Sequence, residues 1–311
     1  MTRSPAKARV SQLPFSRYPP RVRGGIKLSF HGVRGSTPCA GYQYVRYGGN
    51  TSCVSLEADG HDPIVFDMGT GLRPCGQTLA ADGPFHGTIL LSHLHWDHIQ
   101  GLPFFDPISQ PDAVLDVYGP AQEAGPLDAV FRGVMQQPYF PITPDELHGT
   151  VRFHGAGNDD FAINGAKVRS RWVRHTSPTV GFRVDLEGHS VAYVSDHGPG
   201  CSDDPDDFVP PDVLDLADGV DVLIHDAQHT CEEFEQKRHF GHSTVDYAVQ
   251  VAREAGARKL VLFHHCPSHS DDSVDLMHLY AGALAERVAG NLEVLAAREG
   301  MVVELQSALV R

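Results

Sequence analysis

The stretch Ser92–His98, which reads SHLHWDH, follows directly after the apolar run Ile89–Leu91. It holds three histidines and one aspartate, and such polar side chains could be buried in a core only if each of them found a partner. Imidazole and carboxylate groups are the usual ligands of zinc in catalytic sites. At the end of a strand, a turn can direct the first two histidines to one side and the aspartate and the last histidine to the other. The stretch therefore predicts a site for two neighbouring cations, and a loop that is rich in histidine by chance is the alternative.

Three further polar residues, His175, Asp196 and His264, each follow an apolar run that predicts a strand. Each of them alone is typical of a surface or capping residue, but together they can complete a set of metal ligands. Asp67 ends another apolar run before a glycine turn. It either orients a ligand imidazole or is an ordinary turn aspartate.

Short apolar runs bounded by Gly, Asp and Pro predict a strand-rich first half of the chain, and residues 180–194 predict a hairpin that turns at Glu187 and Gly188. The second half alternates buried strands with helices, which we expect over Ser243–Glu254 and Val274–Val288. No linker separates the two halves. The pattern favours one α/β domain with a layered sheet core.

The spacing of the SHLHWDH stretch resembles the signature of the metallo-β-lactamase superfamily, and the later polar residues occur in the family's order. The resemblance covers about residues 26–305. It implies an α/β fold, an αββα sandwich with a two-metal site along one edge of its sheets. It also implies the ligands of two zinc ions, which are His93, His95 and His175 for the first, Asp97, His98 and His264 for the second, and Asp196 as a bridge between both.

Five more segments resemble the phosphodiesterase branch of this superfamily, which includes phosphoribosyl cyclic phosphodiesterases, cyclic-nucleotide phosphodiesterases and ribonuclease Z. They are HGVRGS at residues 31–36, GGNTS at residues 48–52, HTSPTVGFR at residues 175–183, IHDA at residues 224–227 and GHST at residues 241–244. The resemblance therefore implies hydrolysis of a phosphodiester.

In ribonuclease Z, the equivalents of Asp226 and His242 form a carboxylate–histidine pair near the scissile phosphate, with Glu in place of Asp226. The resemblance thus implies His242 as the general acid and Asp226 as the residue that orients it, and Asp97 is counted as catalytic as well as metal-binding. The alternative for His242 is that it merely caps the helix that starts at Ser243.

We therefore expect a dinuclear zinc phosphodiesterase, with Mn²⁺ as an alternative metal. The expected substrate is a small, cyclic phosphodiester such as a cyclic nucleotide or a phosphoribosyl cyclic phosphate. Three alternatives stay open: a ribonuclease Z-like endonuclease that processes tRNA 3′ ends, a lactamase, lactone or thioester hydrolase on the same metal scaffold, and a metal-bound domain without enzymatic activity.

The charge of the chain disfavours RNA as the substrate. The 311 residues include 25 Lys and Arg against 39 Asp and Glu, a net charge of −14, whereas contacts with nucleic-acid phosphates need a basic face. Residues 101–170 carry only four basic side chains against nine acidic ones. No long basic insert could therefore grip a tRNA.

Residues 1–25 contain six Lys or Arg, four Pro and no acidic residue, and we expect them to form a basic disordered tail. Residues 26–311 are expected to form one hydrolase domain. No apolar run approaches the roughly 18 residues of a membrane-spanning helix, and six scattered cysteines without a CxxC pair are typical of reduced thiols in the cytoplasm. We therefore expect a cytoplasmic protein without a membrane partner. The sequence leaves homodimer formation open.

Overall fold

The computed structural model describes residues 24–79, 83–199 and 208–306, and two seven-stranded sheets lie face to face in it. The first sheet has the strand order β14-β1-β2-β3-β4-β5-β6, antiparallel from β14 to β3 and parallel from β3 to β6. Its strands are β1 (Gly25–Gly32), β2 (Cys53–Ala58), β3 (Ile64–Phe66), β4 (His86–Leu90), β5 (Val114–Gly119), β6 (Thr150–Gly155) and β14 (Val302–Gln306).

The second sheet has the order β13-β12-β11-β10-β9-β8-β7, antiparallel from β7 to β10 and parallel from β10 to β13. The expected hairpin joins β9 to β10, and its turn residues Glu187 and Gly188 both have positive φ, as a tight hairpin turn requires. The strands are β7 (Asp159–Ile163), β8 (Ala166–Val173), β9 (Thr179–Leu186), β10 (His189–Val194), β11 (Val222–Asp226), β12 (Lys259–Phe263) and β13 (Glu293–Ala296).

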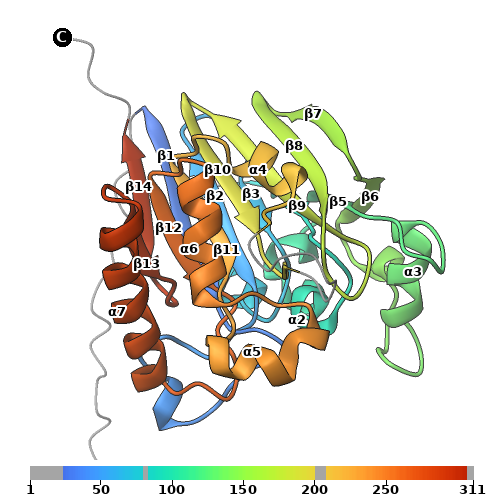
Figure 1. Ribbon diagram of the computed structural model, residues 1–311. Helices are drawn as coiled ribbons and strands as arrows, with labels where there is room; N and C mark the ends of the chain where they lie inside the picture. The colour runs from blue at the N-terminus through green and yellow to red at the C-terminus, as the bar shows by residue number, and fades with distance from the viewer. Residues whose placement is uncertain (1–23, 80–82, 200–207, 307–311) are drawn as a thin grey trace, which may run out of the picture.

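Helices cover the outer faces of the two sheets. Figure 1 shows α6 and α7 along the second sheet, and both pack against its strands β12 and β13. The helices are α1 (Leu72–Thr78), α2 (Trp96–Ile99), α3 (Leu127–Val134), α4 (Pro211–Ala217), α5 (Cys231–Lys237), α6 (Val245–Glu254) and α7 (Asp271–Val288), with single 3₁₀ turns at Tyr42–Tyr44, Leu102–Phe104, Asp106–Ser109, Pro144–Glu146 and Arg238–Phe240.

Three apolar layers hold this arrangement together. The middle layer lies between the sheets, where the ring of Phe66 stacks on that of Tyr193 at a centroid distance of 5.0 Å. The outer layers join each sheet to its helices. In β4, Leu90 enters the middle layer and Ile89 an outer one, which explains why consecutive residues at the end of this strand are apolar. The predicted αββα sandwich is confirmed.

The parallel strands of both sheets position polar residues at their carboxyl ends. Three of these residues have a left-handed backbone although they are not glycine: Asp67 after β3 has φ 57°, Asp196 after β10 has φ 51° and His264 after β12 has φ 61°. This conformation is uncommon for residues with a Cβ, although Asp and His adopt it more readily than most. The turns that aim these side chains are therefore specific features of the fold.

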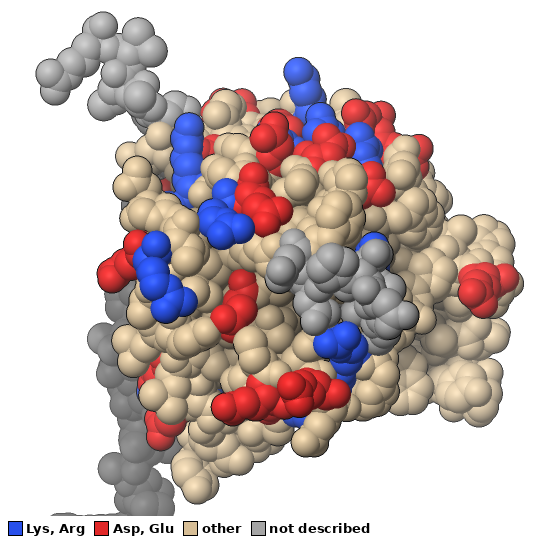
Figure 2. Space-filling view, in the orientation of Figure 1, with Lys and Arg blue, Asp and Glu red and all other residues tan. Residues whose placement is uncertain are grey.

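The predicted tail of residues 1–25 lies almost entirely outside the described residues. Among residues 24–79, 83–199 and 208–306, none of the helices has the length and apolar character needed to cross a bilayer. Five cysteines within these ranges are free thiols, and Cys201 falls outside them. Figure 2 shows Lys and Arg interspersed with Asp and Glu on the displayed face, without a continuous basic patch.

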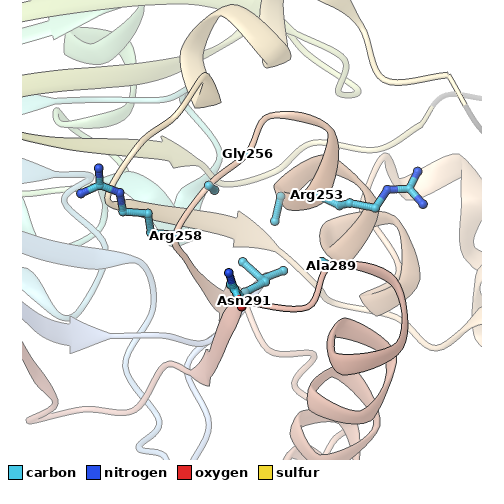
Figure 3. Close-up of a pocket in the computed structure, with 8 residues that line it drawn as sticks. Arg253, Gly256, Arg258, Ala289 and Asn291 are labelled. Atoms are coloured by element: carbon cyan, nitrogen blue, oxygen red, sulfur yellow. The ribbon is translucent and has the colours of Figure 1, made fainter.

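An open pocket of about 260 Å³ lies where α6 and α7 end, lined by Gly256, Ala289 and neighbouring residues. Figure 3 shows that the guanidinium groups of Arg253 and Arg258 turn away from it in opposite directions. Arg258 binds Asp221 instead of facing the pocket. The lining of the pocket is mainly apolar, and none of the predicted site residues belongs to it.

Candidate metal centre

All the predicted site residues come together at the edge where the parallel strands end. The SHLHWDH stretch follows β4, and its last three residues begin the short helix α2. From the opposite sheet, β10 leads to Asp196, β11 ends on Asp226 and β12 leads to His264. These strands are parallel neighbours in register, so their ends reach the same edge.

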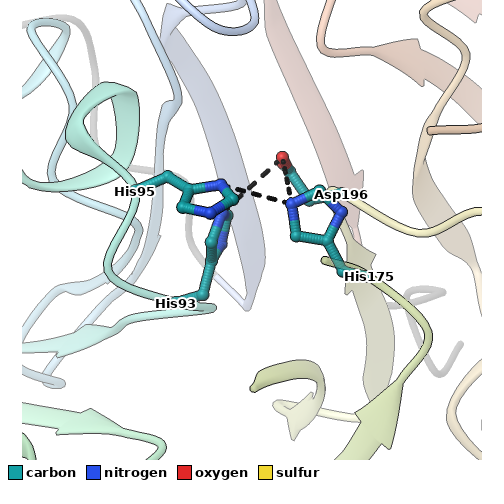
Figure 4. A group of neighbouring side chains, drawn as sticks. All are labelled: His93, His95, His175 and Asp196. Atoms are coloured by element: carbon teal, nitrogen blue, oxygen red, sulfur yellow. Dashed lines mark hydrogen bonds and ion pairs between the residues drawn. The ribbon is translucent and has the colours of Figure 1, made fainter. Parts of the chain in front are cut away.

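The first group of ligand-type side chains contains three histidines and one carboxylate, whose ligand atoms all lie within 4.8 Å of one another. Nε2 of His175 lies 3.3 Å from Nδ1 of His95 and 3.6 Å from Oδ1 of Asp196. Nε2 of His93 lies 3.7 Å from the same carboxylate oxygen. Figure 4 shows the four side chains pointing toward one another, with His93 and His95 on one loop and His175 and Asp196 on others.

The second group is fully buried and shares Asp196 with the first. Nε2 of His98 lies 3.2 Å from Oδ2 of Asp97 and 3.1 Å from Oδ2 of Asp196. Nε2 of His264 lies 3.1 Å and 3.2 Å from the same two oxygens. Asp196 thus presents Oδ1 to the first group and Oδ2 to the second, as a carboxylate that bridges two cations would.

Two buried nitrogens show that this donor set fits metal ions. Nε2 of His93 is buried and has no hydrogen-bond partner, and Nε2 of His98, although close to two carboxylate oxygens, makes no aligned hydrogen bond to either. A buried polar atom without a partner is costly unless something else binds it. Nδ1 of His98 donates to Oδ2 of Asp67 at 2.6 Å. Its Nε2 therefore points into a cluster of carboxylate oxygens that needs a positive charge, and imidazole with carboxylate is the donor set of zinc.

The pKa shifts of His98 and Asp196 also show that opposite charges are packed closely in the centre. Burial alone would raise the pKa of Asp196, but the imidazoles of His264, His98 and His93 lower it well below its usual range. Burial alone would lower the pKa of His98, but three carboxylates, Asp196 foremost, raise it well above its usual value. Both shifts favour the charged form, because opposite charges face each other at short range out of water.

Asp67 supports the ligands from behind, as in the first of its two sequence interpretations. Besides His98, its carboxylate accepts the backbone N–H of Ser92 at 2.7 Å, the hydroxyl of Ser92 at 2.9 Å and the hydroxyl of Tyr193 at 2.7 Å. Four donors fix the carboxylate, which in turn fixes the imidazole. No sequence pattern points to Tyr193, because a tyrosine within an apolar strand is usually a core residue.

The loop after β1 closes on the second group. The backbone N–H of Ser36 donates to Oδ2 of Asp97 at 2.7 Å. A Cβ added at Gly35 would lie 2.4 Å from the ring of His264, so only glycine allows this approach. Arg34 anchors the loop: it is fully buried and pairs with Asp271 at 3.1 Å. The segment HGVRGS thus has a structural role beside the centre.

The predicted carboxylate–histidine pair is formed next to the second group. Nδ1 of His242 donates to Oδ2 of Asp226 at 2.7 Å, and Oδ1 of Asp226 accepts the backbone N–H groups of Gln228 and Ser243 at 3.0 and 3.1 Å. Burial lowers the pKa of His242, but the charge of Asp226 outweighs it and raises the pKa to about 8. His242 is not the residue that caps α6, because the hydroxyl of Thr244 does so.

Comparison with known proteins places this geometry in a family. The model of the beta-lactamase superfamily domain matches residues 64–265, which run from β3 to the loop after β12 and contain all seven proposed metal ligands. The chain belongs to the beta-lactamase superfamily. It is accordingly a metal-binding hydrolase, as the sequence predicted.

Relatives of this beta-lactamase superfamily protein cover most of its length. Ribonuclease Z of Synechococcus sp. (strain WH7803) is 25% identical over 271 residues, which span 71% of this chain and 81% of that protein. The metallo-beta-lactamase fold protein YhfI from Bacillus subtilis superposes with a TM-score of 0.67 at 18% identity. The superposition covers 91% of this chain and 100% of the YhfI chain. The short form of human tRNase Z has a TM-score of 0.59 at 21% identity, covering 89% and 98%. The two solved structures support the shared fold.

Proposed function

We propose that this protein is a two-zinc phosphodiesterase that hydrolyses a small, cyclic phosphodiester. His93, His95 and His175 would hold one zinc and Asp97, His98 and His264 the other, with Asp196 between them. Bound there, the two ions would activate water and neutralise the charge of the phosphate oxygens. The relative named ribonuclease Z supports phosphodiester chemistry.

The observation that carries the proposal is the His242–Asp226 pair beside the second group of ligands. With Nδ1 bonded to Asp226, Nε2 of His242 is left to face a ligand, and ligand atoms of Asp226, His242 and His264 lie within 4.8 Å of one another. When a phosphodiester is cleaved, the leaving alkoxide needs a proton, and a histidine held by a carboxylate can donate it at neutral pH. Asp226 would keep the imidazole in the required orientation and stabilise its charged form.

The small substrate is favoured over tRNA by charge. The net charge of the chain is −14, and binding of a long RNA needs many basic contacts with phosphates. A ribonuclease Z-like activity is the second candidate because of the name of the Synechococcus relative. Activity of the zinc-loaded protein should therefore be compared on cyclic nucleotides, a phosphoribosyl cyclic phosphate, pre-tRNA, a lactam and a thioester.

The role of His242 can be tested through the leaving group. His242→Ala should keep its zinc and lose roughly 10²–10⁴-fold in kcat on an alkyl diester, where the leaving oxygen needs a proton. It should lose far less on bis-nitrophenyl phosphate, because nitrophenolate leaves as a stable anion. Asp226→Asn should change both rates in the same direction by less. Equal losses on both substrates would contradict the proton-donor role, and loss of zinc would show that His242 supports the ligands instead.

A further inference from the structure

Gln228 connects the two parts of the centre. It lies in the turn directly after β11 and is only 3% exposed. Its backbone N–H donates to Asp226, and its side-chain nitrogen lies 3.0 Å from Nδ1 of His264 and 3.5 Å from Oγ of Ser36. A neutral amide buried against a ligand imidazole acts on that imidazole through hydrogen bonding alone.

The other ligand imidazoles with a clear partner are held by acceptors. Nδ1 of His98 donates to the carboxylate of Asp67, and Nδ1 of His175 donates to the carbonyl of Gly241 at 3.0 Å. In each case the proton is held on Nδ1, so Nε2 keeps a lone pair for a metal.

His264 is held in the opposite sense. In this orientation of the amide its nitrogen faces Nδ1 of His264 and can only donate, so a neutral ring must accept at Nδ1 and carry its proton on Nε2. There it is 3.1 Å from Oδ2 of Asp97, to which it donates. This tautomer is self-consistent without a metal, but its Nε2 cannot bind one.

We propose that Gln228 is a positioning residue whose amide orientation sets the tautomer of His264 and thereby the affinity of the second metal. A half-turn of the amide exchanges its nitrogen for its oxygen with almost no change in shape. Nδ1 of His264 then takes up a proton from solvent and donates it in a hydrogen bond to Oε1, while Nε2 releases its own proton to solvent and gains a lone pair. The ring stays neutral, because one proton is taken up for each proton released. This inference rests on the proposed ligand role of His264.

The groups around Nε2 of Gln228 suit either end of the amide. A Cβ added at Gly35 would lie 2.6 Å from Nε2 of Gln228 and 2.4 Å from His264, so the loop after β1 packs closely against the amide and the imidazole together. The hydroxyl of Ser36 lies beside the same amide nitrogen. Because a hydroxyl can donate or accept, it can pair with either the nitrogen or the oxygen of the amide at this position.

The tautomer can be read directly by ¹⁵N NMR of the histidine rings, with His264→Ala used to assign the signal. In wild-type protein without metal, we expect the His264 proton on Nε2, and in the zinc-loaded protein on Nδ1. The same tautomer in both states would overturn the proposal.

Variants at position 228 test the link to metal affinity through chelator-competition titrations with Zn²⁺. Gln228→Glu places an acceptor-only carboxylate against Nδ1, so the second zinc should bind at least as tightly as in the wild type. Gln228→Leu removes the partner, and loss of such a partner typically weakens metal binding by roughly 10–100-fold. The first zinc should be unaffected. Gln250→Leu, which removes an amide paired with Glu254 on α6, is the matched control and should change neither affinity.

The outcomes separate this inference from the proposed function. If wild-type protein binds two zinc ions and Gln228→Leu binds both with unchanged affinity, the role of Gln228 is wrong while the proposed function stands. If wild-type protein and His264→Ala bind the same amount of zinc, the ligand assignment itself is wrong, and both proposals are overturned.

Discussion

Arg34 and Arg46 both make ion pairs with the helix α7, but Arg34 is buried and Arg46 is exposed to solvent. Comparing them tests whether the buried ion pair holds the loop beside the centre. The guanidinium of Arg34 is fully buried and donates to Asp271 and to the carbonyls of Gly48 and His269 at 2.8–3.1 Å. Arg46 lies at the surface and pairs closely with two other aspartates of α7, Asp272 and Asp275, while its guanidinium is 4.0 Å from Asp271. We predict that Arg34→Met is strongly destabilising and that Arg46→Met is not.

The magnitude follows from the partners that Arg34 leaves behind. Removing one partner of a buried ion pair costs about 3–5 kcal/mol. Asp271 would still accept the backbone N–H groups of Arg46 and Tyr47, so its charge is not left without donors, and the lower end of that range, about 3 kcal/mol, is expected. An exposed ion pair is screened by water and contributes much less.

Urea unfolding of the metal-free protein, followed by circular dichroism, measures both effects. Adding Asp271→Asn to Arg34→Met should recover part of the loss, because asparagine still accepts backbone hydrogen bonds but buries no charge. Equal free energies of unfolding for Arg34→Met and Arg46→Met would refute this reasoning. It would also be refuted if the double variant lost as much free energy of unfolding as Arg34→Met and Asp271→Asn lose when each is measured alone and the two losses are added.

Three further predictions concern the centre and its flank. Asp196→Ala should bind less zinc than the wild type and lose turnover, and full zinc content in elemental analysis would contradict the bridging role. Gly35→Ala should weaken the second zinc in a chelator titration, because its Cβ would meet the ring of His264; unchanged affinity would show that the loop can retreat. Burial would raise the pKa of Glu233, but the N–H of Thr230 and the ring of His269 outweigh it and lower the pKa to about 2. The stability that Glu233 contributes is therefore present above its unfolded pKa and is lost as the pH falls from there toward 2. The difference in unfolding free energy between wild type and Glu233→Gln should shrink over that interval. A difference that stays constant would show that the ionised form of Glu233 contributes no stability.

The sequence predicted the fold and the residues of the centre because both are encoded by residue type. Continuous apolar runs such as Ile89–Leu91 indicate strands buried on both faces, and polar residues directly after them mark the shared edge. The helix α1 was not predicted, since it contains Pro74 and Gly76, which are poor helix formers; packing against the first sheet outweighs this preference. The helix α5 was also missed, although Thr230 and Glu233 form a capping box that the sequence carries openly.

No sequence pattern identifies the backbone groups that form hydrogen bonds with the ligand side chains. The N–H of Ser36 and the carbonyl of Gly241 hold ligand side chains, but every residue has these groups, so only the fold reveals which ones are used. Gln228 belongs to none of the sequence motifs, because a single glutamine after a strand is ordinary. It contacts His264 because β11 and β12 lie side by side, and this pairing cannot be read from the sequence.

The left-handed conformations of Asp67, Asp196 and His264 have a consequence for how such a protein changes over evolutionary time. A residue with a Cβ in this conformation is strained by roughly 1 kcal/mol or more relative to glycine, and here three of them stand at the ends of three strands. In a lineage no longer selected for hydrolysis, replacement of Asp196 or His264 by glycine would relieve this strain. Asp67 differs, because its loss would leave four buried donors without their acceptor. Backbone strain therefore favours loss of these two metal ligands, while the carboxylate behind them is retained.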